Sequence, residues 1–439
     1  MRLVASRSAL SGSAAVPGSK SHTIRAVALA ALAEGRSEIL GPLVGADTAS
    51  AVSAYRALGA RIDDADPGRW LVDGVAGRPA APAGAIDVGN SGTTLFVALG
   101  SAALGDRPVR FVGDEQTSRR TAGPLLAALA ALGARSTSRA GTGCTPIEIC
   151  GPLAGGRAEI SCPTSQYLTS LLLAAPLARG DSEITVKLLN ERPYVEMTLD
   201  WLAGQGIRLE RRGLEHFRIP GGQAYRGFRK AVAADWSGAT FFLAAAAVTG
   251  SEILLSGLDL RDPQGDKEVV RYLARMGCLW RETPEGLVLA GGALRGAELD
   301  LNATPDALPA LAVVGCFAEG RTVLGNVPQA RQKETDRIAV MARELSRLGG
   351  RVEELPDGLV VHGGGLRGGE ASGHGDHRVV MALAVAGLAS DRPVEVDTAE
   401  AVNVTFPNFV ELLAGLGADV RRIESDAPGR NPSPSGQGR

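Results

Sequence analysis

The sequence predicts an α/β fold of two similar domains, each made of three repeated units with buried parallel helices inside and sheets outside. Three observations lead to this prediction. Six glycine turns recur at spacings of 74, 73, 71, 72 and 68 residues, and each period contains two helical patterns of different character. The chain of 439 residues is also too long for one hydrophobic core of ordinary size.

Each glycine turn follows an amphipathic helical pattern. The six predicted helices cover residues 49–58, 124–132, 195–202, 267–276, 336–348 and 409–416, and the glycines that follow are Gly59, Gly133, Gly206, Gly277, Gly349 and Gly417. A glycine directly after the last helical turn is typical of a left-handed helix C-cap, because glycine adopts positive φ without a steric penalty.

The other helical pattern of each period is apolar on every face. It covers residues 26–33, 94–104, 167–177, 239–248, 307–317 and 379–388. A helix without a polar face has to be buried on all sides, and one unit of this size cannot cover it alone. Three units packed around their apolar helices can bury all three helices, so six units give two domains.

The boundary between the third and fourth units falls near Ala233. We expect one domain over residues 19–233 and a second over residues 1–18 together with 234–424. The strand-like segment 1–16 precedes the first helix and is therefore available to pair with the second half. Residues 425–439 are rich in Pro, Gly and Ser, which predicts a disordered tail.

Composition argues against several classes of protein. A formal net charge of −2 gives no overall attraction to nucleic acid or anionic membranes, so any affinity for anions must come from a local cluster. No apolar run approaches the ~20 residues of a membrane-spanning helix, and no apolar segment typical of a secretory signal follows the first residues, so we expect a cytoplasmic protein. The five cysteines show no paired spacing, which argues against disulfides and a zinc site.

The starts of the six apolar helices carry most of the residues suited to chemistry. They are Ser19-Lys20-Ser21 with Arg25, Gly89-Asn90-Ser91-Gly92-Thr93, Thr164-Ser165-Gln166, Asp235-Trp236-Ser237, Pro305-Asp306 and Gly375-Asp376-His377-Arg378. Simple N-capping accounts for the Ser, Thr, Asn and Asp residues. It does not account for Lys20, Arg25 or Arg378, because cations are disfavoured at the positive end of a helix dipole. An anion held between the helix amides and these cations would explain both.

Two further clusters carry charge. Residues 113–120 form a turn-like segment that ends in Arg119 and Arg120. Residues 331–337 open the amphipathic helix of the fifth unit, and they are either a solvated helix start or an anion site with one acid–base carboxylate, Glu334. His377 is either a buried hydrogen-bonded residue or part of the same site.

In these motifs the chain resembles the enolpyruvyl transferases, most closely the members that act on shikimate 3-phosphate. The matching segments are Pro17-Gly18-Ser19-Lys20-Ser21 with Arg25, Gly89-Asn90-Ser91-Gly92-Thr93, Thr164-Ser165-Gln166-Tyr167, Lys333-Glu334-Thr335-Asp336-Arg337 and Asp376-His377-Arg378. Each is only moderately selective, but all five occur in order at repeat-matched positions, and the resemblance runs from Pro17 to about Leu416. The resemblance implies two domains of three βαβαββ units each, an inside-out α/β barrel, joined by two crossings.

The resemblance also implies the reaction. The enolpyruvyl group of phosphoenolpyruvate is transferred to the 5-hydroxyl of shikimate 3-phosphate through a tetrahedral addition intermediate, with release of phosphate and without a metal or organic cofactor. The expected partners are these two small molecules, with neither nucleic acid nor membrane, and the protein is expected to be a monomer.

Residue roles follow from the same resemblance. The expected catalytic residues are Lys20, Asp306 as the base for the attacking hydroxyl, Glu334 as the proton donor to the methylene carbon, and His377 as an orienting group. The expected phosphoenolpyruvate ligands are Lys20, Asn90, Gly92, Arg120, Gln166, Arg337 and Arg378. The expected shikimate 3-phosphate ligands are Ser21, Arg25, Thr164, Ser165, Gln166, Tyr194, Asp306, Gln329 and Lys333. The chemistry agrees, because two polyanionic substrates require clustered cations, and enol ether formation requires one proton to be delivered to carbon and another to be removed from oxygen. Two domains that close on both substrates would exclude water.

Four positions depart from the family pattern. Phe96 stands where relatives often carry arginine, Thr121 where proline usually follows the arginine equated with Arg120, and Val404 where well-known members have a lysine that contacts phosphoenolpyruvate. Glu191 occupies the position of a serine expected at the substrate phosphate. These changes leave open a divergent subfamily, a different acceptor and the sensitivity to glyphosate, the family's inhibitor.

Other functions fit less well. The branch that acts on UDP-N-acetylglucosamine usually has a reactive cysteine in the loop corresponding to residues 113–120, and this chain has none there. A sister enolpyruvyl transferase or a shikimate dehydratase of secondary metabolism stays open. A non-catalytic anion-binding scaffold would not need Lys20, Asp306, Glu334, His377 and Arg378 together.

Overall fold

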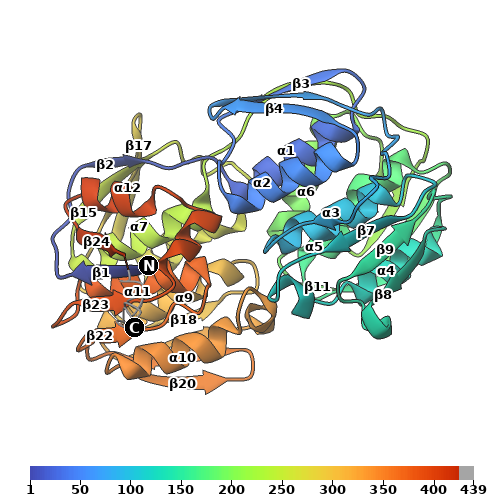
Figure 1. Ribbon diagram of the computed structural model, residues 1–439. Helices are drawn as coiled ribbons and strands as arrows, with labels where there is room; N and C mark the ends of the chain where they lie inside the picture. The colour runs from blue at the N-terminus through green and yellow to red at the C-terminus, as the bar shows by residue number, and fades with distance from the viewer. Residues whose placement is uncertain (425–439) are drawn as a thin grey trace, which may run out of the picture.

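The computed structural model describes residues 1–424, so the tail predicted for residues 425–439 lies outside the described residues. Within residues 1–424 the strands form six four-stranded sheets, and two helices accompany each sheet (Figure 1). No helix of this part of the chain is long and apolar enough to cross a membrane.

The apolar helices are buried as predicted. They are α1 (Lys20–Leu32), α3 (Gly92–Ala102), α5 (Ser165–Ala174), α7 (Trp236–Thr249), α9 (Leu308–Phe317) and α11 (His377–Gly387). In α7 every residue from Trp236 to Ala247 is buried. Several of these helices begin before the apolar pattern does, because the polar residues at their starts form the first helical turn.

The second helix of each unit covers the outer side of the inner helices. These helices are α2 (Ala46–Ala57), α4 (Gly123–Ala131), α6 (Arg192–Gly204), α8 (Val269–Arg275), α10 (Arg337–Arg347) and α12 (Phe409–Gly415). The six glycines that follow them all have positive φ, from 69° at Gly206 to 108° at Gly277, which confirms the predicted left-handed turns. Three predicted starts were inaccurate: α2 begins at Ala46 rather than at residue 49, α6 begins at Arg192 rather than at residue 195, and a 3-10 turn, η4 (Gly265–Glu268), precedes α8.

The strands of the first half form three sheets with the orders β14-β3-β5-β4, β6-β7-β9-β8 and β10-β11-β13-β12. Their bounds are β3 (Arg36–Leu40), β4 (Arg61–Asp66), β5 (Arg69–Asp73), β6 (Ile86–Asp87), β7 (Val109–Val112), β8 (Arg135–Ser138), β9 (Ile147–Cys150), β10 (Gly156–Cys162), β11 (Ser182–Leu189), β12 (Glu210–Arg212), β13 (His216–Ile219) and β14 (Arg229–Ala231). In the third sheet β10 and β11 are parallel and flank α5, whereas β11, β13 and β12 pair antiparallel.

The sheets of the second half repeat this pattern, with the orders β16-β17-β15-β2, β18-β19-β21-β20 and β22-β23-β1-β24. Their strands are β1 (Arg2–Ser6), β2 (Ser13–Ala15), β15 (Glu252–Ser256), β16 (Leu279–Thr283), β17 (Gly286–Ala290), β18 (Glu298–Asp300), β19 (Arg321–Gly325), β20 (Arg351–Leu355), β21 (Gly358–His362), β22 (Gly369–Ala371), β23 (Val394–Val396) and β24 (Asp419–Ile423).

The two halves exchange strands where the chain crosses between them. β1 pairs with β23 and β24, and β2 pairs with β15, so the N-terminal segment belongs to the second half as predicted. In the opposite direction, β14 pairs with β3 of the first half. Figure 1 shows the dark blue β1 among the orange and red elements of the C-terminal half.

Two separate hydrophobic cores accompany these sheets. One joins residues between Ile24 and Tyr225, and the other joins Leu3, Ala5, Leu10 and Ala14 to residues between Trp236 and Val420. We propose that these cores belong to two domains with the predicted boundaries, residues 19–233 and residues 1–18 with 234–424.

Candidate active site

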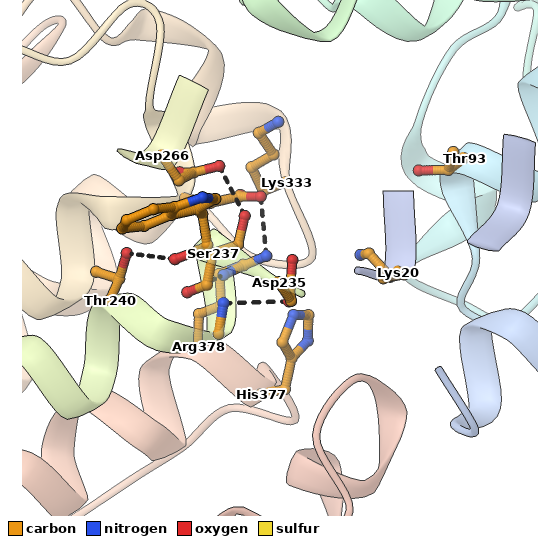
Figure 2. Close-up of polar contacts among 12 residues, drawn as sticks. Lys20, Thr93, Asp235, Ser237, Thr240, Asp266, Lys333, His377 and Arg378 are labelled. Carbon is orange, nitrogen blue, oxygen red and sulfur yellow. Dashed lines mark hydrogen bonds and ion pairs between the residues drawn. The ribbon is translucent and has the colours of Figure 1, made fainter. Parts of the chain in front are cut away.

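A cleft of about 400 Å³ lies between the two halves, where the starts of the inner helices meet. Ten of the predicted site residues line it: Lys20, Gly92, Arg120, Thr164, Gln166, Asp306, Gln329, Lys333, Glu334 and Arg378. The others, Ser21, Arg25, Asn90, Ser165, Tyr194, Arg337 and His377, are not part of this lining. Figure 2 shows Lys20 and Thr93 on one side of the cleft, facing Lys333, His377 and Arg378 on the other.

Around the start of α3, which we call the α3 corner (Lys20, Gly92 and Arg120), cations meet a helix N-terminus. Gly92 lets Arg120 approach, since a Cβ atom at Gly92 would lie only 2.5 Å from the Arg120 Nη1 atom. The Nε and Nη2 atoms of Arg120 are buried but donate no hydrogen bond within residues 1–424. Lys20 Nζ pairs with Asp47 Oδ2 at 3.0 Å. The α3 corner therefore presents hydrogen-bond donors to an anion.

The start of α5 forms a second site, the α5 corner (Thr164, Ser165, Glu191 and Lys333). Glu191 Oε2 accepts hydrogen bonds from the Ser165 amide at 3.0 Å, the Ser165 hydroxyl at 2.8 Å and the Thr164 hydroxyl at 3.2 Å. The Lys333 ammonium, which comes from the other half, pairs with Glu191 Oε1. Burial would lower the pKa of Lys333, but the negative charges of Glu191 and Asp306 raise it. In the α5 corner the carboxylate of Glu191 therefore already accepts the hydrogen bonds of these donors.

Arg337 connects the two carboxylates expected to transfer protons. Its buried guanidinium donates to Asp306 Oδ1 at 2.7 Å, to Glu334 Oε2 at 2.6 Å and to both oxygens of Asp376 at 2.8 and 3.1 Å. Arg378 Nη2 adds an ion pair to Asp306 Oδ2 at 3.0 Å. Because bidentate and charge-assisted hydrogen bonds fix both partners, Asp306 and Glu334 are held in a defined geometry.

Electrostatics keeps both carboxylates ionised in this arrangement. Burial would raise the pKa of Asp306, but the positive charges of Arg378, Lys333 and Arg337 outweigh it and lower the pKa. Glu334 shows the same balance, with burial opposed mainly by Arg337 and Arg120, and its pKa falls well below the ordinary value. Arg120 Nη2 lies 3.4 Å from Glu334 Oε1, so the acid is in contact with the α3 corner.

His377 is a neutral buried side chain. Burial lowers its pKa to about 3, despite the nearby carboxylates of Glu334 and Asp376. Its Nε2 atom is buried without a hydrogen-bond partner in the described part of the chain. Next to it, Arg378 Nη1 donates to the Ser237 carbonyl at 3.5 Å (Figure 2).

Two residues predicted to bind shikimate 3-phosphate, Arg25 and Tyr194, form hydrogen bonds within the protein. Arg25 is buried and donates to the Thr198 and Thr169 hydroxyls at 2.9 and 3.1 Å and to the carbonyls of Ser21 and Tyr194. Burial lowers the pKa of Arg25 to about 10. The Tyr194 hydroxyl donates to Asp266 Oδ2 at 2.7 Å, across the two halves. Asp266 is also buried, and its burial together with the charge of Asp306 raises its pKa to about 6.

Three predicted amide ligands also have protein partners. Asn90 Nδ2 donates to Asp114 and Gln116 at 2.6 Å each. Gln166 Nε2 donates to the Thr93 hydroxyl at 2.8 Å. Gln329 Nε2 donates to a backbone carbonyl, but its buried Oε1 atom has no hydrogen-bond partner within residues 1–424.

Besides Glu191, three residues depart from the family pattern, and two of them line the cleft. Phe96 lines the cleft and packs edge-on against Tyr167, with ring centroids 5.0 Å apart. Thr121 also lines the cleft and donates to the Thr142 carbonyl at 2.8 Å. Val404 is not part of the lining, and its carbonyl approaches Gly45, where a Cβ atom would meet it at 2.9 Å.

Sequence reasoning missed several lining residues, among them Asp47, Thr93, Gln116 and Tyr167. Asp47 is the most important, because its carboxylate is the partner of Lys20. An acidic residue in the first turn of a helix is common simply because it suits the helix dipole, so Asp47 gave no distinguishing signal.

Clustered cations, helix N-termini and two separate carboxylates in one cleft between the two halves define a class of protein. They are typical of an enzyme that binds polyanionic small molecules and moves protons between them.

Comparison with known proteins agrees with this class. The family described as EPSP synthase (3-phosphoshikimate 1-carboxyvinyltransferase) matches residues 4–413, and the chain belongs to this family. It is 50% identical to the 3-phosphoshikimate 1-carboxyvinyltransferase of Acetivibrio thermocellus, over 97% of this chain and 100% of the relative. It is 46% identical to the enzyme of the same name from Ruminiclostridium cellulolyticum, over 96% of this chain and 100% of the relative.

The fold is shared with solved structures. An EPSP synthase from Acinetobacter baumannii matches with a TM-score of 0.79 and 28% identity, over 96% of this chain and 100% of that one. The predicted fold class is therefore confirmed.

Proposed function

We propose that this chain transfers the enolpyruvyl group of phosphoenolpyruvate to the 5-hydroxyl of shikimate 3-phosphate, with release of phosphate. One observation of the structure carries the proposal: Arg337 holds Asp306 at 2.7 Å and Glu334 at 2.6 Å in a cleft that also contains Lys20, Arg120 and Arg378. The relatives named 3-phosphoshikimate 1-carboxyvinyltransferase match over nearly the full length of this chain and support the same reaction.

Phosphoenolpyruvate is assigned to the α3 corner and the neighbouring arginine of α11. Arg120 has two buried nitrogen atoms that donate no hydrogen bond within residues 1–424, and Lys20 and Arg378 add charge from the starts of α1 and α11. Gly92 leaves the start of α3 open to a close approach. A phosphate and a carboxylate both suit such a donor set, because guanidinium groups bind planar and tetrahedral oxyanions through paired hydrogen bonds.

The acceptor is assigned to the part of the cleft next to the α5 corner. Thr164 lines the cleft from the first half, and Gln329, Lys333 and Asp306 line it from the second half. We expect Asp306 to remove the proton of the attacking hydroxyl, since it is ionised and its carboxylate faces the cleft. Ser21, Arg25 and Tyr194 lie behind this surface and are proposed to shape it.

Glu334 is proposed to deliver the proton to the methylene carbon. In this structure its pKa is lowered by Arg337 and Arg120, so it is ionised before substrates arrive. Phosphoenolpyruvate brings negative charge next to the same cations, which offsets their effect and raises the pKa of Glu334. Glu334 therefore takes up a proton as the substrate binds and delivers it to the methylene carbon, and loss of phosphate together with one hydrogen of the resulting methyl group completes the transfer.

His377 and Arg337 are proposed as positioning groups. His377 is neutral and buried beside Asp376 and Arg378, so it orients its neighbours without adding charge. A cytoplasmic location and a monomeric state stay predictions.

Phosphate release from phosphoenolpyruvate tests the proposal. The acceptors are shikimate 3-phosphate, shikimate and UDP-N-acetylglucosamine, each with the wild-type chain and with Lys20→Met. Release that requires shikimate 3-phosphate and is lost in Lys20→Met supports the assignment. Release only with UDP-N-acetylglucosamine, or none with any acceptor, contradicts it.

A further inference from the structure

An anion supplied by the chain itself occupies the N-terminus of α5. Three donors, the Thr164 hydroxyl, the Ser165 amide and the Ser165 hydroxyl, converge on Glu191 Oε2 at 3.2, 3.0 and 2.8 Å. Lys333 pairs with the other oxygen. The Glu191 side chain is only 3% exposed, so water does not compete for these donors.

Glu191 is built into this position by its backbone. It is the N-cap of α6 with φ 58° and ψ 41°, a left-handed conformation that is uncommon for glutamate. Its side chain does not cap α6, and the side chain of Thr164 does not cap α5. The Glu191 carboxylate takes over the capping of α5 from a different element, and it also contacts the opposite half of the molecule through Lys333.

The same donor set suits a phosphate group. A helix N-terminus, two hydroxyls and an ammonium are general ligands of phosphate monoesters, which carry more charge and more acceptor oxygens than a carboxylate. The corner adjoins the cleft, because Thr164 and Lys333 both line it. Two anions cannot share these donors, since like charges in one site oppose binding.

We propose that Glu191 is a specificity-determining residue whose carboxylate competes with the phosphate of the acceptor for the α5 corner. The inference rests on the proposed function, because it concerns the acceptor of that reaction. A phosphorylated acceptor binds only after the carboxylate has left Thr164, Ser165 and Lys333. An acceptor with a hydroxyl at that position does not compete, because its O–H can donate to Glu191. Glu191 therefore reduces the preference of the enzyme for a phosphorylated acceptor over one that carries a hydroxyl at that position.

Two substitutions separate charge from size. Glu191→Gln keeps the shape and loses the charge, whereas Glu191→Ser removes both. With phosphoenolpyruvate saturating, we expect the KM for shikimate 3-phosphate to fall by about tenfold or more in both variants, because the competing charge is gone. The kcat is expected to stay within about threefold, since Glu191 does not touch the reacting atoms. The ratio of kcat/KM for shikimate 3-phosphate to that for shikimate should rise about tenfold or more in both variants.

A matched control and a binding measurement make the test decisive. The control, Glu196→Gln, removes an exposed carboxylate of the same helix, which pairs with Arg211 at 2.7 Å. It should change neither the KM for shikimate 3-phosphate nor the KM for shikimate. Calorimetric titration with inorganic phosphate should give tighter binding in both Glu191 variants. If Glu191→Ser does not fold, Glu191→Gln decides.

The outcomes separate the two proposals. An unchanged or raised KM for shikimate 3-phosphate in folded Glu191→Gln overturns the role of Glu191, while wild-type turnover still supports the proposed function. Absence of wild-type turnover with either acceptor contradicts the proposed function. Calorimetry with phosphate then still judges Glu191, since unchanged binding overturns competition and tighter binding supports it.

Discussion

The α3 and α5 corners are equivalent positions of two repeated units, yet they differ in what they hold. In the α3 corner, Arg120 lies against Gly92 with two buried nitrogen atoms that donate no hydrogen bond in the described part of the chain. In the α5 corner, Glu191 engages the hydroxyl and amide donors and Lys333. The repeat supplies the geometry of an anion site, and residues outside the helix decide whether that site is open to a ligand.

This difference assigns different tasks to the two corners. The α3 corner gains by accepting an anion, because buried donors without partners are unfavourable. The α5 corner must first release an internal carboxylate, so its net gain from the same ligand is smaller. The acid pair on Arg337 lies next to the α3 corner, through the contact between Arg120 and Glu334.

Removing the acid should have the largest effect. In Glu334→Gln we expect kcat to fall by about 10³-fold, because general acid catalysis contributes about 10²–10⁴-fold. Phosphoenolpyruvate should still bind, since the cations of the α3 corner are intact. Steady-state kinetics and a calorimetric titration measure the two quantities, with Glu354→Gln, an exposed partner of Arg331, as control. A kcat within a few-fold of wild type would exclude Glu334 as the proton donor.

Removing Arg120 should weaken anion binding at the α3 corner selectively. Arg120→Met is expected to raise the KM for phosphoenolpyruvate by about 10²-fold, because a buried charge-assisted contact is lost, and to leave shikimate 3-phosphate binding unchanged. In Arg120→Lys the KM for phosphoenolpyruvate should lie between the values for the wild type and Arg120→Met, since lysine keeps the charge but lacks the planar guanidinium. Arg110→Met, on the exposed face of β7, is the control. Equal losses for both substrates in Arg120→Met would remove the distinction between the corners.

The sequence predicted the architecture better than the site. The apolar helices and the glycine turns gave six units, because burial and positive φ leave direct marks on residue type. The helix starts pointed to Lys20, Arg25 and Arg378, because cations at the positive end of a helix need an explanation, whereas the role of Asp306 came from the family resemblance. The placement of Glu191 could be noted only as a departure, since its left-handed backbone and its contact with Lys333 depend on segments far apart in the sequence. Asp47 was missed because it is an ordinary residue for a helix start.

A smaller change sharpens the α3 corner further. In Gly92→Ala, the new Cβ atom would lie 2.5 Å from Arg120 Nη1, so the guanidinium has to move. We expect the KM for phosphoenolpyruvate to rise about tenfold, because a displaced donor loses part of its hydrogen-bond energy. Gly204→Ala, where a Cβ atom meets nothing within 4 Å, is the control. An unchanged KM would mean that Arg120 does not act through this contact.

Proton linkage gives the smallest effect and a test of sign. The pKa of Glu334 is lowered by Arg337 and Arg120 in the protein without substrates. Substrate anions offset these charges and raise it, so binding takes up protons at any pH between the two pKa values. Calorimetry in two buffers of different ionisation enthalpy, at about pH 6, should show that the wild-type chain takes up more protons per complex than Glu334→Gln, by up to about one. An equal number of protons taken up or released by both proteins would contradict the assignment.

The most direct measurement is the fate of the methylene hydrogens of phosphoenolpyruvate in D₂O. If Glu334 protonates the methylene carbon, the addition intermediate carries a CH₂D group, and loss of either of its two protium atoms leaves deuterium in the product. With shikimate 3-phosphate and the wild-type chain, we predict deuterium in the enolpyruvyl group of the product by mass spectrometry, and none in phosphoenolpyruvate incubated without the acceptor. Product that forms without deuterium would contradict proton delivery to carbon, and with it the role of Glu334.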